Sequence, residues 1–182
     1  MNRLTFLKNL LGAGLMPAVA LASPTDMETE AQRIRRELLE AWVMSEKMTL
    51  ITAVQMPADS FDFRYTPEAM TFAEQWRHCC QFTVSQLAVR LGVSNPYQAR
   101  ELPKTMAKPE VLNELKVMYT FVRQTITTVP DAKLLEMDDY LGDKIPNWRL
   151  LYAMENHLIH HRGQCMVYLR LKGISPEGYL GW

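Results

Sequence analysis

The residues of this 182-residue chain best suited to metal chemistry are its four histidines: His78, His157, His160 and His161. His157 and His161 are four residues apart in a segment of helical character, so both imidazoles lie on one face and can share an ion. His160 points off that face, and we predict a surface or capping histidine. An HxxxH pair alone is also typical of solvated or structural histidines, and no HExxH metalloprotease motif accompanies it.

His78 lies in the middle of a separate predicted helix, where its other possible role is that of a hydrogen-bonded core histidine. A helical bundle brings the middles of two helices together, and its interior is where metal sites of this kind are built. Three imidazoles, from His78, His157 and His161, would then ligate one ion. Such a ligand set leaves coordination positions open for water or substrate, which is the mark of a catalytic site.

Gln164 is predicted to lie on the same helix face as His157 and His161, where it could orient a ligand or a bound water. A purely structural role for Gln164 fits the sequence equally well. For Arg162, the structural interpretation is an ion pair with a nearby acidic residue.

The three cysteines are Cys79, Cys80 and Cys165. Cys79 and Cys80 flank His78, but at 3.6 residues per turn they point about 100° and 200° away from it, toward the packing. Adjacent cysteines do not readily bridge each other. Either could pair with Cys165, yet free buried thiols are our prediction.

Four segments of helical periodicity must position these side chains: residues 27–55, 71–91, 109–128 and 146–172. Thr71 and Glu74 form a capping-box pattern at the start of the second segment, and Gly92 ends it. Residues 131–145 are predicted to be an acidic connection with at most a short helical turn, and strand signals are weak throughout. The sequence therefore predicts an all-α protein, a four-helix bundle whose longer loops allow a crossover.

The first 22 residues have the features of a signal peptide, and we predict a domain over residues 23–182. Arg3 and Lys8 precede an apolar stretch, and Ala20 to Ala22 offers a small-x-small cleavage site. The segment around Arg3 resembles a twin-arginine motif with one arginine, so the export route stays open. The alternatives are an uncleaved anchor or a first helix, but the stretch is short for a membrane span. We expect an exported protein, in the bacterial periplasm.

Composition excludes several classes of protein. The formal net charge is zero, and no basic stripe of the kind that binds nucleic acid is present. No later segment is long and apolar enough to cross a membrane. The overall composition is that of an ordinary globular protein.

Three stretches of the chain resemble the DinB/YfiT-like family: residues 61–92, which contain His78; residues 157–164, HLIHHRGQ; and residues 168–182, YLRLKGISPEGYLGW. The second stretch is similar to the family's HxxHHRGQ signature and is the most specific. The resemblance implies a four-helix bundle, a frequent homodimer, and a histidine triad that binds zinc, nickel or manganese. It places the ligands at His78, His157 and His161.

A divalent ion held by three neutral imidazoles lowers the pKa of a bound water or thiol toward neutrality. We therefore expect a metal-dependent hydrolase or a thiol transferase of the type found in the family, with an unidentified small-molecule substrate. Family relatives that use thiols are chiefly cytoplasmic, which weighs against thiol transfer in an exported chain. The alternatives are a non-catalytic, metal-stabilised helical binding module and a plain helical protein with core histidines.

Overall fold

The computed structural model describes residues 28–181, so the predicted signal peptide, residues 1–22, lies outside the described residues. The described chain forms four long helices, a short helix and a two-stranded hairpin. Their bounds are α1 Glu30–Gln55, α2 Phe72–Leu91, α3 Lys108–Thr128, α4 Asp131–Leu135, β1 Met137–Tyr140, β2 Asp143–Pro146 and α5 Asn147–Leu171, with a 3-10 turn, η2, at Ala58–Ser60. The four helical segments predicted from sequence agree with α1, α2, α3 and α5 within a few residues.

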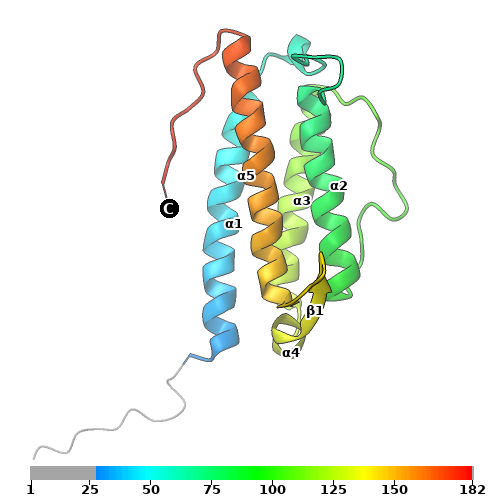
Figure 1. Cartoon of the computed structure of the whole chain (residues 1–182), viewed down its shortest axis with the longest axis vertical. Coiled ribbons are helices and arrows are strands. Elements are labelled where there is room, and N and C mark those ends of the chain that lie inside the picture. Colours follow the sequence, from blue (N-terminus) through cyan, green and yellow to red (C-terminus); the bar gives the residue numbers. More distant parts are fainter. Residues whose placement is uncertain (1–27, 182) are drawn as a thin grey trace, which may run out of the picture.

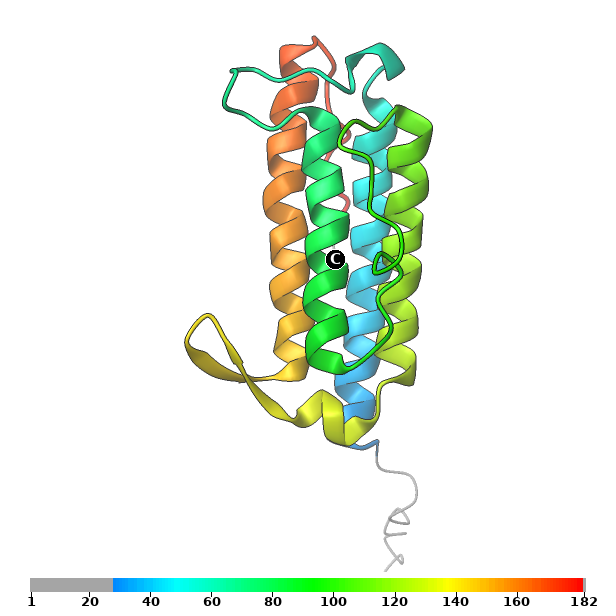
Figure 2. The ribbon, with the colours of Figure 1, turned by 90° about the vertical axis from the view of Figure 1, so that its right-hand side faces the viewer.

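The four long helices lie side by side as a bundle (Figure 1). Helix α5 packs against both α1 and α2, and α3 packs against the same two helices on the other side. The loop of residues 92–107 runs back along the bundle, so α2 and α3 begin at the same end (Figure 2). The crossover that the loop lengths allow is therefore present, and it leaves α2 antiparallel to α5, its partner at the histidine cluster.

Local capping chemistry defines where the site-bearing helix α2 begins and ends. Thr71 and Glu74 form the predicted capping box, with each side chain accepting a hydrogen bond from the other residue's backbone N–H. The helix stops at Gly92, which adopts a left-handed conformation with φ of 66°. This geometry strains a residue that carries a Cβ, and glycine adopts it freely.

The core runs along the whole bundle and is rich in large aromatic side chains. Trp42 of α1 and Tyr119 of α3 pack edge to face, with ring centroids 5.8 Å apart. Phe72 and Trp76 of α2 make a similar pair at 5.9 Å. All four are fully buried, and this packing holds the helices in a fixed rotation about their axes.

The hairpin β1–β2 is a correction to the sequence analysis, which predicted only a helical turn between residues 131 and 145. The strands pair antiparallel, with Tyr140 opposite Asp143. Leu141 and Gly142 connect them, and both have positive φ, 53° and 92°. Two positive φ values are typical of the I′ turn that suits a hairpin. The pattern was hard to detect because leucine, not asparagine or aspartate, occupies the first turn position and no residue of either strand is buried.

None of the described helices is both long and apolar enough to span a membrane.

Candidate metal centre

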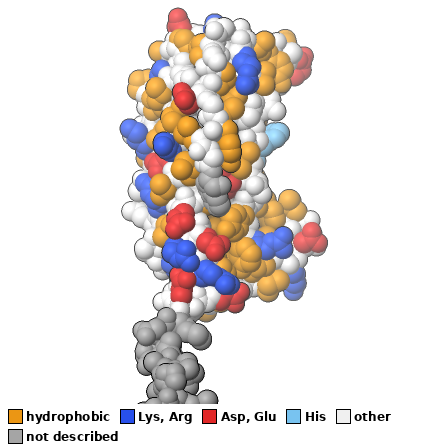
Figure 3. Space-filling view, turned by 90° about the vertical axis from the view of Figure 1, so that its left-hand side faces the viewer, with side chains coloured by type: hydrophobic (Ala, Val, Ile, Leu, Met, Phe, Trp, Pro, Cys, Tyr) orange, Lys and Arg blue, Asp and Glu red, His pale blue; other side chains and the backbone are white. Residues whose placement is uncertain are grey.

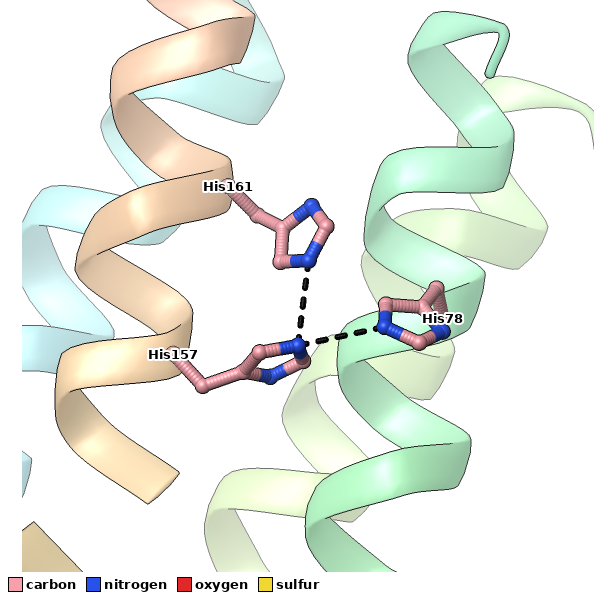
Figure 4. A group of neighbouring side chains, drawn as sticks. All are labelled: His78, His157 and His161. Carbon is pink, nitrogen blue, oxygen red and sulfur yellow. Dashed lines mark hydrogen bonds between the residues drawn. The ribbon is translucent and has the colours of Figure 1, made fainter. Parts of the chain in front are cut away.

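The side chains of His78, His157 and His161 meet between α2 and α5 (Figure 4). The Nε2 atom of His157 lies 3.1 Å from Nε2 of His78 and 3.1 Å from Nε2 of His161. One ligand nitrogen from each of the three rings lies within 4.8 Å of the other two. The structure thus brings together two neighbours on one helix and a third residue 79 positions away along the chain.

Gln75 fixes the orientation of the His161 ring. Its side-chain oxygen accepts a hydrogen bond from Nδ1 of His161, and this requires the proton to be on Nδ1. The lone pair of His161 Nε2 then points toward the other two rings, as a metal ligand requires. Gln75 in turn lies 3.4 Å from the hydroxyl of Tyr168, which donates to the backbone oxygen of Met70.

Gln75 was not among the residues predicted for the site, although its position in the sequence carries a signal. Gln75 precedes His78 by three residues and therefore lies on the same helical face. The role became recognisable only when the packing of α2 against α5 placed this face opposite His161.

Phe82 forms an apolar wall of the cluster. Its ring stacks on His78 with centroids 5.6 Å apart and lies 4.7 Å from the ring of His157. Burial lowers the pKa of His78, and burial together with the neighbouring imidazoles lowers the pKa of His157 and of His161 to about 4. All three rings are therefore neutral at physiological pH, which is the state that binds a metal ion.

The donor set fits a divalent metal ion. Two nitrogens that each lie about 2.1 Å from one ion can be no more than about 4.2 Å apart. The two separations from His157 Nε2, 3.1 Å each, satisfy this limit, and the nitrogens of His78 and His161 lie within 4.8 Å of each other. Neutral imidazoles are ligands for zinc, nickel and other divalent transition metals. Nδ1 of His157 is buried without a hydrogen-bond partner among the described residues, so the ring orientation of His157 depends on packing.

The fourth histidine, His160, is exposed on α5. Its ring meets that of His161 edge to face, 5.0 Å between centroids, and it does not belong to the cluster. Gln164, the residue predicted to support a ligand, is half-buried, and its amide makes no hydrogen bond to another described residue. Its supporting role stays a prediction.

The cysteines beside His78 are unsuited to nucleophilic chemistry. Cys79, Cys80 and Cys165 are buried and free, as the helical geometry predicted for the first two. Burial raises the pKa of each thiol, well above its ordinary value for Cys79 and Cys165. A thiolate, the reactive form, is therefore strongly disfavoured at all three positions.

A shallow cavity of about 290 Å³ opens beside His78. It is lined by Arg64, Glu68, Ala69, Met70, Glu74, Arg77, His78 and Gln81. Both signs of charge are present on its walls. His78 is the member of the histidine cluster that lines this cavity, so a small polar molecule could approach His78.

The chain matches the model of the DinB family over residues 27–180, which is most of its length. The chain belongs to the DinB family. Two crystal structures of DinB-like proteins share its fold. The one from Bacillus subtilis has a TM-score of 0.63 at 17% identity, and the one from Bacillus cereus ATCC 10987 has 0.65 at 19%; each match covers 79% of this chain and 96% of the other.

A curated relative of this DinB-family chain is the uncharacterized protein YrdA of Bacillus subtilis (strain 168). It is 36% identical over 61 residues, which are 34% of this chain and 36% of YrdA. The match therefore spans about a third of that relative's length. The family assignment predicted from the HLIHHRGQ stretch is confirmed.

Proposed function

We propose that this DinB-family chain binds one divalent metal ion through His78, His157 and His161, and that the bound ion supports hydrolysis of a small polar substrate. The observation that carries the proposal is the convergence of three neutral imidazoles, one of which is held in the correct tautomer by Gln75. Zinc, nickel and manganese are the candidate ions. A bound divalent ion lowers the pKa of a coordinated water or thiol toward neutrality.

The chain's own residues perform two tasks in this proposal. Gln75 holds the His161 lone pair toward the ion, and Phe82 excludes water from one side of the cluster. The cavity beside His78 admits the substrate. Its walls carry Arg64 and Arg77 together with Glu68 and Glu74, and Arg64 lies 3.8 Å from Glu74, so the lining favours a polar substrate without favouring one sign of charge. Because all three cysteines are buried, thiol transfer would require an external thiol.

The proposal is tested by metal analysis and turnover measured together. Purified wild-type protein should retain about one divalent ion per chain, and His157→Ala should lose it. His160→Ala is the matched control, because it removes an exposed imidazole from the same helix turn and should keep the ion.

Turnover should then be screened with a panel of small esters, amides and phosphoesters. We expect activity that needs the ion and disappears in His157→Ala. A protein that binds the ion tightly yet turns over no member of the panel, with or without an added low-molecular-weight thiol, would be the non-catalytic module. Wild-type protein that takes up no ion would refute the whole proposal.

We further propose that residues 1–22 are a signal peptide, that the chain is exported to the bacterial periplasm, and that it forms a homodimer. N-terminal sequencing of the protein from a periplasmic extract should give Ser23 as the first residue, and sedimentation equilibrium should give twice the chain mass. An uncleaved N-terminus would contradict the signal peptide and the export that depends on it. A monomer in sedimentation equilibrium would contradict the homodimer alone.

A further inference from the structure

A second cavity lies on the face of α5 that turns away from the histidine cluster. Its volume is about 490 Å³, and α1, α5 and the C-terminal tail form its walls. The tail runs along this face (Figure 1), and apolar side chains gather beside it in the surface view (Figure 3). Most of the lining is apolar and includes Met48, Ile51, Ile159, Met166 and Leu180. Size and lining are those of a small-molecule site.

Arg162 is the cationic residue of this cavity. Its side chain lines the space although the residue is only 6% exposed. Nη1 donates to the Thr49 hydroxyl at 3.2 Å and to the Ser45 backbone oxygen at 3.5 Å. Neither Nε nor Nη2 makes a hydrogen bond within the described residues, so donors remain available to a ligand.

No carboxylate pairs with Arg162 within 4 Å among residues 28–181, so the ion pair predicted for it from the sequence is absent there. A buried guanidinium is costly unless an anion neutralises it, and buried arginines are almost always paired. Its planar fork matches a carboxylate, which it binds through two parallel hydrogen bonds.

Glu155 also lines the cavity, and burial raises the pKa of its carboxyl group, while Ser45 and Arg162 lower it. Its charge opposes an anionic ligand and would favour a cationic one. The more exposed Glu177, on the tail, adds to this opposition. Arg162 is buried, with 6% exposure, and no carboxylate of residues 28–181 comes within 4 Å of it. Because the guanidinium cannot lose its charge, we take Arg162 as the group that selects the ligand, and an anion as its partner.

We propose that this cavity binds a monocarboxylate with an apolar chain or ring, its carboxylate on Arg162 and its apolar part against Ile51, Ile159 and Met166. The site is separate from the proposed metal centre. Residues 155, 159, 162 and 166 of α5 line the cavity, while His157 and His161 point toward α2. The proposal therefore does not depend on a metal ion.

The test is calorimetric titration of the full chain with three ligands of equal chain length: octanoate, 1-octanol and octylammonium. We expect octanoate to bind at least about tenfold more tightly than the other two, since charge-assisted bidentate hydrogen bonds are the strong ones. Equal binding of octanoate and octanol, or preference for octylammonium, would overturn the proposal. Octanoate binding should also persist in His157→Ala; its loss there would place the ligand at the metal centre instead.

Four variants locate the site. Arg162→Lys keeps the charge but not the fork and should weaken octanoate binding about tenfold, whereas Glu155→Gln should strengthen it. Arg170→Lys, an exposed arginine of the same helix, should change nothing. Ala41→Leu fills the cavity and keeps Arg162, so it should weaken octanoate binding. This variant tests the location of the octanoate site even if Arg162→Lys does not fold. Unchanged octanoate affinity in Ala41→Leu, or a dimer interface that excludes octanoate from this face, would refute the assignment.

Discussion

The substitution Gln75→Leu removes the acceptor that orients the His161 ring. Leucine has a similar volume, and position 75 is buried, with 6% exposure, so the packing of α2 is largely kept. His161 is itself only 8% exposed, so water cannot easily replace the lost acceptor. The variant should therefore affect the histidine cluster more than the fold.

The size of the effect depends on where the His161 proton lies. Without metal, the proton can move to Nε2 and donate to Nε2 of His157, 3.1 Å away. A bound ion occupies Nε2 and confines the proton to Nδ1, which is left buried and unsatisfied at a cost of about 1–3 kcal/mol. The penalty therefore appears when the metal binds, and we expect the metal affinity of Gln75→Leu to be about 10–100-fold lower than that of wild type. This is the range seen when groups that orient metal ligands are removed.

The assay is a competition titration of zinc between the protein and a chelating indicator at pH 7.5. Gln164→Leu is the matched control: it removes an amide from α5 whose side chain makes no hydrogen bond to another described residue, and we expect its zinc affinity to stay within about twofold of wild type. The reasoning would be refuted if Gln75→Leu bound zinc as tightly as wild type. If Gln164→Leu alone lost zinc affinity tenfold, Gln164 and not Gln75 would be the residue that supports a metal ligand.

Three further predictions concern stability. Because the pKa values of His157 and His161 are lowered to about 4 in the fold, the unfolded chain binds more protons than the folded chain between pH 6.5 and 4. In urea denaturation of the metal-free protein, the free energy of unfolding should therefore be highest above about pH 6.5 and fall toward pH 4, with a loss of at most about 2 kcal/mol per histidine at pH 5. A free energy of unfolding that does not change with pH over this range would contradict the lowered pKa values. Arg100→Ala should lower the free energy of unfolding by about 1–3 kcal/mol, because it leaves the buried carboxylate of Glu114 without its two guanidinium hydrogen bonds. If chemical denaturation gives a decrease below about 0.5 kcal/mol, solvent screens the ion pair. Gly142→Ala should lower the free energy of unfolding by about 1 kcal/mol, because the φ of 92° at this position strains a residue with a Cβ. The zinc affinity should stay unchanged. Weaker zinc binding would show that the hairpin is coupled to the histidine cluster.

The fold was largely predictable because the periodic apolar residues and the end signals of each helix are local. Thr71, Glu74 and Gly92 define the ends of α2 in the structure as they do in the sequence. The hairpin was not predictable from the same rules, because Leu141 adopts a positive φ that leucine rarely takes.

The candidate site was predictable in its ligand types and only partly in its surroundings. Helical spacing alone places His157 and His161 on one face, and the prediction that they bind an ion together with His78 rested on the family resemblance and on bundle geometry. The acceptor Gln75 could not be chosen over Gln164, because that choice depends on how α2 and α5 are rotated against each other. The second cavity depends on where the tail lies along α1 and α5, which no local pattern encodes.

The most direct test of the metal centre is a crystal structure of the zinc-loaded protein with anomalous diffraction data collected above and below the zinc absorption edge. We predict one peak between α2 and α5, about 2.0–2.1 Å from Nε2 of His78, His157 and His161. A peak that lacks His78 as a ligand, or zinc-saturated crystals with no peak at this position, would contradict the central claim that the three imidazoles hold one ion.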